Sequence, residues 1–401
     1  MRKHRSDRII GVLTFVLIAV GLIIIYAIGP MRANSMNNAY GSDYSENYFF
    51  VHQAISVAIS VIAFILAFKL PYEKVRKYAK VIVVLGLVLC VVLAILAVVG
   101  SSMANCQLGA CRWINLGGLS VQPAEILKLG LVLYLAQMMA QKKKEGTLGD
   151  LKEFFVPFAI VVGLSLFFVV IVQKDLGTGV TMVMMTLLML YMSGIEMKKF
   201  WAVVGIVAAA GVLAIVTSPH RMERLLTFGG NSDDNASYHI DNALMAIGSG
   251  GLFGKGIGNS VQATGYLPES INDSIFAVLG ETFGFFGLML ILVAFVWLLT
   301  RLLKVSAGLE MEQSLVVVGI FAWIGTHVIV NIAAMTGLVP LTGITLPLLS
   351  YGGTSMMMMA FGLGLVLQLS CYTNRKEERN EDTGSRGRVG RTRHASRRGR
   401  D

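Results

Sequence analysis

The chain has 401 residues, of which 55% are hydrophobic and only 14% are charged, and its net charge is +10. A soluble globular protein carries about 25% charged residues, so this composition excludes an ordinary soluble domain. Hydrophobic runs long enough to cross about 30 Å of hydrocarbon recur along the chain, and we therefore expect an all-α polytopic membrane protein.

The hydrophobic runs predict ten transmembrane helices. The first run is too long for a cleaved signal peptide, and no small-residue cleavage site follows it. The fourth and sixth runs are short and interrupted by polar residues. The expected spans are 9–29, 49–68, 81–99, 124–140, 154–172, 176–193, 200–217, 274–300, 314–337 and 353–371.

The distribution of basic residues predicts the orientation of these spans. With the N-terminus in the cytoplasm, 27 of the 34 Lys and Arg residues fall in cytoplasmic segments, 6 fall outside, and Lys128 lies within a span. Cytoplasmic loops are enriched in Lys and Arg, so both termini are expected in the cytoplasm. The same bias explains most of the net charge, and we expect no nucleic-acid partner.

Two regions are expected. Residues 1–371 form the ten-span membrane domain, with a large outside loop at 218–273 between the seventh and eighth helices. Residues 372–401 form a basic cytoplasmic tail that has too few apolar residues to bury a core and is expected to be disordered. The tail is either a solvated anchor attracted to anionic membrane lipids or a docking segment.

Cysteines, histidines and glycines give few signals of their own. Cys106 and Cys111 share an outside loop, where they either form a disulfide or remain two thiols. His52 and His327 are expected to be packed polar residues within the bundle rather than ligands. The glycines at 248–258 do not have the spacing of a dinucleotide-binding fingerprint.

Two polar clusters precede the large loop. Pro123 suits a helix start, which places Glu125 and Lys128 at i, i+3 on one face of the fourth span. They form either a structural ion pair or part of a binding site. Asp175, in a very short outside turn, either caps the sixth helix or contributes to a site.

The large loop ends by placing an acid at the mouth of the eighth span. A carboxylate there is costly unless something uses or satisfies it, so Asp273 is either a helix cap or a reactive group. Arg221 and Arg224 lie three apart and would share a face of a helical turn. They either grip an anionic group or balance the acids of the loop.

Prolines and paired glycines recur between the ninth and tenth spans, at 337–343 and 346–355. Irregular backbone at membrane depth has to be buried in protein or line a cavity. We therefore expect this segment to be buried in protein or to line a cavity, and its polar residues are candidates for contacts with a ligand.

Five motifs together resemble the SEDS family (shape, elongation, division and sporulation) of bacterial cell-wall proteins. They are RWxxLGxxxxQPxE at 112–125, QxDLGT at 173–178, GxGNSVQ at 256–262, LPE followed by an acid at 267–273, and LPLLSYGGTS at 346–355. The residues at 258–262 and 342–343 are closer to the division branch (FtsW) than to the elongation branch (RodA), and the sporulation branch is similar at both places.

The resemblance implies a peptidoglycan glycosyltransferase that polymerises lipid II at the outer face of the cytoplasmic membrane during cell division. It implies Asp273 as the essential acid, with lipid II, the growing glycan strand, a class B penicillin-binding protein and other divisome membrane proteins as partners. No cofactor is certain, although a divalent cation (Mg or Mn) would suit the pyrophosphate. The candidate substrate-binding residues are Arg112, Glu125, Lys128, Asp175, Arg221, Arg224, Lys255, Glu269, Ser350 and Tyr351.

Some residues depart from the family pattern, and other functions stay open. The family mostly has a His two residues before the acid, where this chain has Ile271, and of the usual pair of acids in the eighth span only Glu281 remains. The alternatives are a lipid II flippase, a scaffold for the penicillin-binding protein, or an elongation role. An assay of lipid II polymerisation with the purified chain distinguishes these alternatives, because a flippase or a scaffold would make no glycan polymer.

Overall fold

The computed structural model describes residues 6–107, 110–117, 119–217, 222 and 235–373. Within them, nine helices are long and apolar enough to cross a membrane, and a shorter apolar helix occupies the sixth expected span. All ten expected runs are therefore helical, while the number that cross the membrane stays a prediction. Arg221, Arg224 and the tail 374–401 lie outside the described residues.

The first half of the chain contains five helices and three short strands. Pro123 is the first residue of the fifth helix, where its missing N–H costs nothing. The elements are α1 (Arg8–Tyr40), α2 (Tyr48–Lys69), α3 (Tyr72–Lys77), α4 (Ala79–Val99), β1 (Ala104–Gln107), β2 (Ala110–Leu116), β3 (Leu119–Val121) and α5 (Pro123–Lys144).

The second half is helical, with π-helical turns at both ends of the fifth expected span. The elements are η1 (Leu151–Phe155), α6 (Val156–Leu166), η2 (Phe167–Val172), α7 (Leu176–Met192), α8 (Met197–Val216), α10 (Asn235–Ser249), η3 (Gln262–Thr264), α11 (Ile275–Ala307), α12 (Met311–Met335) and a last helix, Gly353–Thr373.

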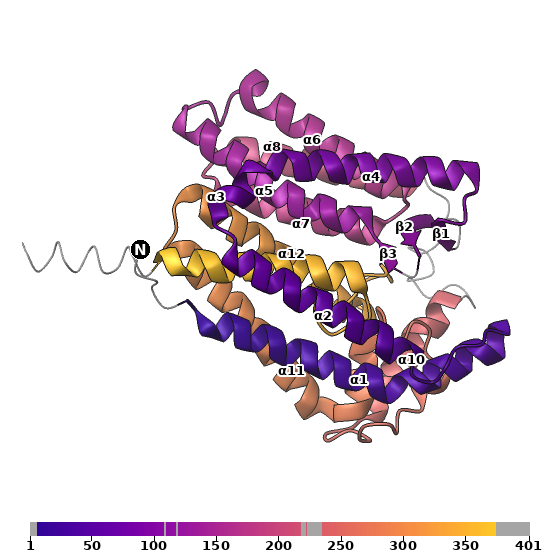
Figure 1. Ribbon diagram of the computed structural model, residues 1–401. Coiled ribbons are helices and arrows are strands. Elements are labelled where there is room, and N and C mark those ends of the chain that lie inside the picture. The colour runs from indigo at the N-terminus through magenta and orange to yellow at the C-terminus, as the bar shows by residue number, and fades with distance from the viewer. Residues whose placement is uncertain (1–5, 108–109, 118, 218–221, 223–234, 374–401) are drawn as a thin grey trace, which may run out of the picture.

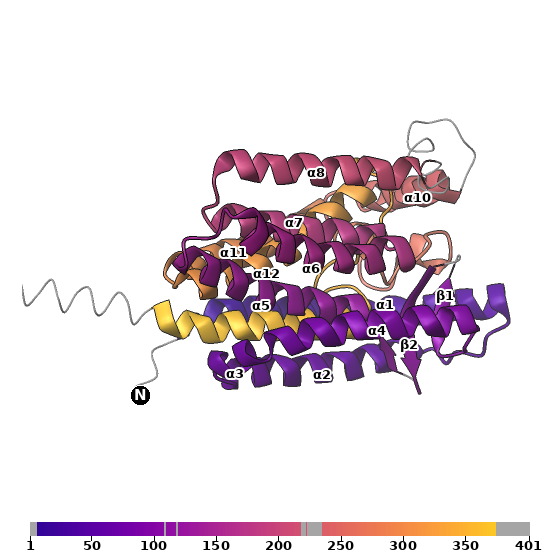
Figure 2. The same ribbon diagram turned by 90° about the horizontal axis from the view of Figure 1, so that it is seen from above.

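The long helices run side by side, with the strands and α10 at one end of the bundle (Figures 1 and 2). The start of α1 and the end of the last helix lie at the other end, where Asp7 N–H donates to Ser370 Oγ. Helices α5, α12 and the last helix are the most buried, whereas α8 has no buried residue and lies at one edge in Figure 2. The polar clusters therefore collect around the buried helices.

The small sheet was not expected from the sequence. Its strands pair antiparallel in the order β1-β2-β3, and Cys106 lies opposite Cys111, to which it is joined by a disulfide. The bond closes the hairpin just before Arg112, so the sheet fixes the start of the strand that carries this side chain.

Helix α11 is broken at Gly284, whose φ of 67° and ψ of −167° are open only to glycine. The loop after α10 fills the break with backbone hydrogen bonds: Lys255 N–H donates to Glu281 O (2.9 Å) and Phe285 N–H to Gly251 O (2.8 Å). Unpaired backbone groups are costly at membrane depth. The break and the glycine-rich loop therefore form one unit.

Candidate active site

Asp273 lies in the turn that leads into α11. Its residue surface is only partly exposed, and its Oδ1 is buried without a hydrogen-bond partner in the described part of the chain. Its backbone carbonyl accepts a hydrogen bond of 2.6 Å from Asn331 Nδ2 on α12. The backbone of Asp273 is thus fixed at the start of α11, while its carboxylate does not cap this helix.

The surroundings of Asp273 favour its protonated form. Burial raises the pKa of the Asp273 carboxyl to about 7, and the nearby charge of Glu269 adds to the rise. The backbone N–H groups of Asp273 and Ser274 and the charge of Arg112 act in the opposite direction on this pKa. A carboxyl that titrates near neutral pH can both take up and release a proton under physiological conditions.

The turn before Asp273 is tied to two other helices. Glu269, at a φ of 48°, accepts from Arg32 Nη2 of α1 at 3.3 Å and from the Asn272 side chain. Ser274 Oγ donates to Pro268 O and lies 2.6 Å from Nε2 of His239 on α10. These contacts fix the position of the acid relative to α1 and α10.

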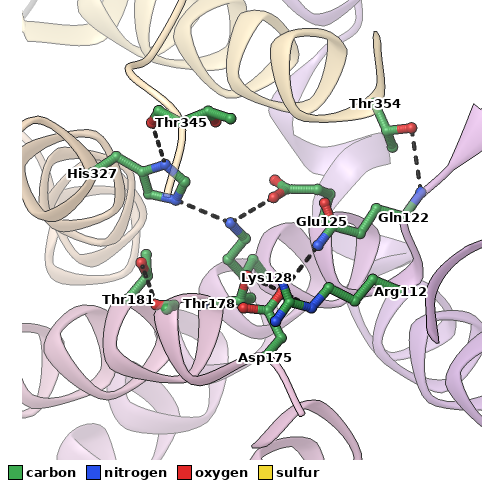
Figure 3. Close-up of polar contacts among 11 residues, drawn as sticks. Arg112, Gln122, Glu125, Lys128, Asp175, Thr178, Thr181, His327, Thr345 and Thr354 are labelled. Atoms are coloured by element: carbon green, nitrogen blue, oxygen red, sulfur yellow. Dashed lines mark hydrogen bonds and ion pairs between the residues drawn. The ribbon is translucent and has the colours of Figure 1, made fainter. Parts of the chain in front are cut away.

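Arg112 and Asp175 come together from β2 and the start of α7 (Figure 3). Arg112 Nη2 donates to Lys174 O at 3.0 Å, and its Nε lies 4.0 Å from Asp175 Oδ2. Asp175 caps α7 by accepting from Thr178 N–H at 3.0 Å, and Gln122 Nε2 donates to its Oδ2 at 3.2 Å. The capping interpretation of Asp175 is confirmed, and its role towards substrate stays a prediction.

Glu125 and Lys128 form the ion pair that their spacing predicts. Lys128 Nζ lies 2.8 Å from Glu125 Oε1, and neither side chain is more than 3% exposed. The same ammonium lies 3.2 Å from Nε2 of His327 (Figure 3). It also lies 4.8 Å from the centre of the Trp323 ring. Both ring nitrogens of His327 are satisfied when the ring is neutral and Nδ1 carries the proton. Nε2 then accepts from Lys128 Nζ, and Nδ1–H donates to Thr345 O at 3.2 Å.

Lys255 is paired with Glu281, which was not predicted as its partner. Glu281 is fully buried in α11 and accepts from Lys255 Nζ (2.7 Å), Ser260 Oγ (2.6 Å), Val261 N–H (3.0 Å) and Gln262 N–H (3.1 Å). Glu281 is eight residues beyond Asp273, which corresponds to about 12 Å along a helix. The pair gives the glycine-rich motif a structural role, and binding of substrate by Lys255 stays a prediction.

Ser350 and Tyr351 lie in a turn that packs against the turn of Asp273. Ser350 Oγ accepts from Leu346 N–H at 2.8 Å, and Tyr351 N–H donates to Ile271 O at 2.8 Å. The Tyr351 ring stacks edge-on against Phe49, with centroids 5.7 Å apart. The irregular segment thus packs against the turn of Asp273, and the contacts of these two residues with substrate stay predictions.

The sequence analysis missed several polar residues of this region. Asn331 is a polar group within an apolar helix, and the cost of burying it is the signal that could have found it. Glu281 was noted in the sequence, but its pairing with Lys255 was not predicted. His239 on α10, whose Nε2 lies 2.6 Å from Ser274 Oγ, was not among the predicted site residues. No group of three or more His, Cys, Asp or Glu residues within the described ranges is placed to hold a metal ion.

Comparison with known proteins identifies the family of this chain. Residues 8–375 match the family model FtsW/RodA/SpoVE, described as cell cycle protein. Stage V sporulation protein E of Bacillus subtilis strain 168 is 34% identical over 377 residues, which cover 93% of this chain and 99% of that protein. The probable peptidoglycan glycosyltransferase FtsW of Escherichia coli O6:H1 is 35% identical over 302 residues, which cover 74% of this chain and 71% of that protein.

Solved structures share the fold at lower identity. A chain in a structure that concerns the coordination of polymerization and crosslinking by a peptidoglycan synthase complex superposes with a TM-score of 0.69 at 21% identity, over 91% of this chain and 97% of that one. The rod shape determining protein RodA of Thermus thermophilus gives 0.64 at 23% identity, over 91% and 96% of the two chains. The chain is a multi-pass membrane protein and belongs to the FtsW/RodA/SpoVE family of cell cycle proteins.

Proposed function

We propose that this chain is an inverting peptidoglycan glycosyltransferase that polymerises lipid II during cell division, with Asp273 as its general base. The observation that carries the proposal is the Asp273 carboxyl: its Oδ1 is buried and unpaired among the described residues, and its pKa is raised to about 7. Relatives named probable peptidoglycan glycosyltransferase FtsW support the reaction class.

The proposed reaction needs only one proton acceptor. A sugar linked to lipid pyrophosphate already carries a good leaving group, so no general acid is required, in contrast to glycoside hydrolysis with its two carboxyl groups. Asp273 takes the proton of the attacking 4-hydroxyl while the new glycosidic bond forms and the pyrophosphate departs. A single displacement of this kind inverts the anomeric carbon.

The departing pyrophosphate requires positive charge. Among the described residues, Arg112 has a positive charge that lowers the pKa of Asp273. Its guanidinium also has a buried Nε without a hydrogen-bond partner in the described structure. Arg221 and Arg224 stay candidates in the loop beyond the described residues. A divalent cation held partly by acids would serve the same end.

The proposal places the reaction at the outer face of the cytoplasmic membrane, with both termini in the cytoplasm and the protein at the division septum. The excess of Lys and Arg in the alternate segments supports this orientation. A class B penicillin-binding protein is the proposed partner, because the similar complex coordinates polymerization with crosslinking. Contacts with other divisome membrane proteins are part of the same proposal.

Asp273 variants test the assignment with purified protein and lipid II in detergent. Asp273→Ala and Asp273→Asn should abolish the glycan polymer while the chain inserts and purifies normally. Asparagine caps a helix about as well as aspartate, so the Asn variant separates a base from a cap. Substantial polymer from Asp273→Asn would remove Asp273 from the catalytic role, and no polymer from the parent chain would refute the enzyme itself.

A further inference from the structure

Helix α12 presents two buried polar side chains, His327 and Asn331, one helical turn apart on the same face. Both contact the irregular segment after α12: His327 Nδ1 lies 3.2 Å from Thr345 O, and Asn331 Nδ2 donates to Ile344 O at 2.7 Å. This face joins the pair formed by Glu125 and Lys128 to the turn of Asp273.

Asn331 uses both hydrogens of its amide on backbone carbonyls. It donates to Asp273 O at 2.6 Å and to Ile344 O at 2.7 Å, and its side chain is almost completely buried. A side-chain amide has two donor hydrogens, so it bridges the peptide that carries Asp273 and the segment after α12. Replacing it leaves two buried carbonyls without this donor.

The bridged segment also passes the guanidinium of Arg112. A methyl group added at Gly343, next to Ile344, would lie 3.8 Å from Arg112 Nη1. One side chain therefore sets the place of Asp273 relative to the segment 342–345, which lies beside Arg112. A displacement of about 1 Å between reacting groups can cost about 100-fold in rate.

We propose that Asn331 is a positioning residue for polymerisation, which holds the Asp273 carboxylate at a fixed place relative to Arg112 and the segment 342–345. The inference rests on the proposed function. It adds a residue of α12 that touches neither substrate nor the reacting carboxylate oxygens and acts through the backbone of Asp273.

Two replacements of Asn331 remove the bridge in different ways. Asn331→Leu keeps the branched shape at a larger volume and loses both donors, and Asn331→Asp keeps shape and volume and, when ionised, cannot donate to either carbonyl. Each should lower kcat for lipid II by roughly 100-fold with KM changed by less than about threefold, since the substrate contacts remain. Asn331→Ser retains one donor hydrogen and should lose less of kcat than the other two.

Gln368 provides the matched control. It is a buried amide near the C-terminal end of the last helix (Gly353–Thr373) and donates to the backbone carbonyl of Leu70. This end of the helix lies opposite the strands (Figure 1). Gln368→Leu should lower thermal stability while kcat stays within about threefold of the parent.

The inference is overturned if Asn331→Leu and Asn331→Asp keep kcat within threefold of the parent, or if Gln368→Leu loses as much kcat as they do. Should the Leu variant not purify, Asn331→Asp and Asn331→Ser decide the question by the same measurement. A parent chain that makes no polymer would instead contradict the proposed function, so the two failures are distinguishable.

Discussion

At the scale of single residues, the carboxyls of the site differ in how far they are satisfied: Oε2 of Glu125 is buried without a hydrogen-bond partner in the described structure, but its Oε1 is paired with Lys128. Glu281 accepts four hydrogen bonds of 3.1 Å or less, and Asp175 caps α7. Asp273 has a buried oxygen without a partner among the described residues. This contrast separates the proposed base from acids whose contacts are structural.

The pKa of Asp273 leads to a prediction for pH. The base has to be ionised, so kcat/KM should rise with pH through about 7 and level off above about 8. Glu269→Gln removes a negative charge that raises this pKa, and the inflection should move to lower pH. A profile that is flat between pH 6 and 8, or an inflection that moves upward in Glu269→Gln, would contradict this role of the two acids.

The same pKa has a consequence for stability. Because the folded-state pKa is raised, the stability that the protonated Asp273 provides is lost as pH rises through about 7. Asp273→Asn should therefore raise the free energy of unfolding at pH 8 by up to about 4 kcal/mol, with a matching rise of the thermal midpoint. At pH 5 the gain should be much smaller. Asp150→Asn is the control, since hydrogen bonds from Glu153 and Lys152 N–H lower the pKa of Asp150 and no alkaline gain is expected.

The buried pair of Glu125 and Lys128 predicts a non-additive mutant cycle. Removing one partner leaves a lone charge inside the bundle, which typically costs about 3–5 kcal/mol, whereas removing both is less costly. The thermal stabilities of Glu125→Gln, Lys128→Met and the double variant measure the coupling. Additive losses would mean that the 2.8 Å contact contributes no pairing energy.

At the scale of elements, the helices could be predicted from the sequence because long apolar runs leave helical backbone as the only way to satisfy every peptide group in lipid. The sheet of β1, β2 and β3 could not, since its strands have only three to seven residues in a polar loop. Helix α10 was missed for a similar reason, because it lies in the polar segment 218–273, which has no long apolar run. The break in α11 depends on a contact between Gly284 and Gly254 that no local pattern reveals.

That break can be tested with alanine. A Cβ at Gly284 would lie 2.3 Å from Gly254 N, and the φ and ψ of Gly284 alone cost a non-glycine residue about 1–3 kcal/mol. Gly284→Ala should therefore lower the thermal midpoint strongly. Gly211→Ala in α8 meets nothing within 4 Å and should be neutral or stabilise by up to about 1 kcal/mol. Equal midpoints for the two variants would show that α11 tolerates a continuous helix at this point.

At the scale of the whole molecule, the bundle brings motifs from distant parts of the sequence to one end. The sequence predicted that Asp273, Asp175 and Arg112 belong on the same side of the membrane, because charge bias fixes loop sides. It could not predict that α12 links the buried Lys128 to the turn of Asp273, since His327 and Asn331 are separated from their partners by up to 199 residues. Such contacts arise only from packing.

The most direct test of glycan polymerisation uses the purified chain in liposomes that contain fluorescent lipid II. Two quantities are measured on the same sample: the length of glycan strands, and the fraction of lipid II that changes leaflet. An enzyme with Asp273 as its base should produce strands without moving lipid II across the bilayer, and Asp273→Asn should produce neither strands nor translocation. Translocation of lipid II without any strand would contradict the polymerase and identify the chain as a transporter.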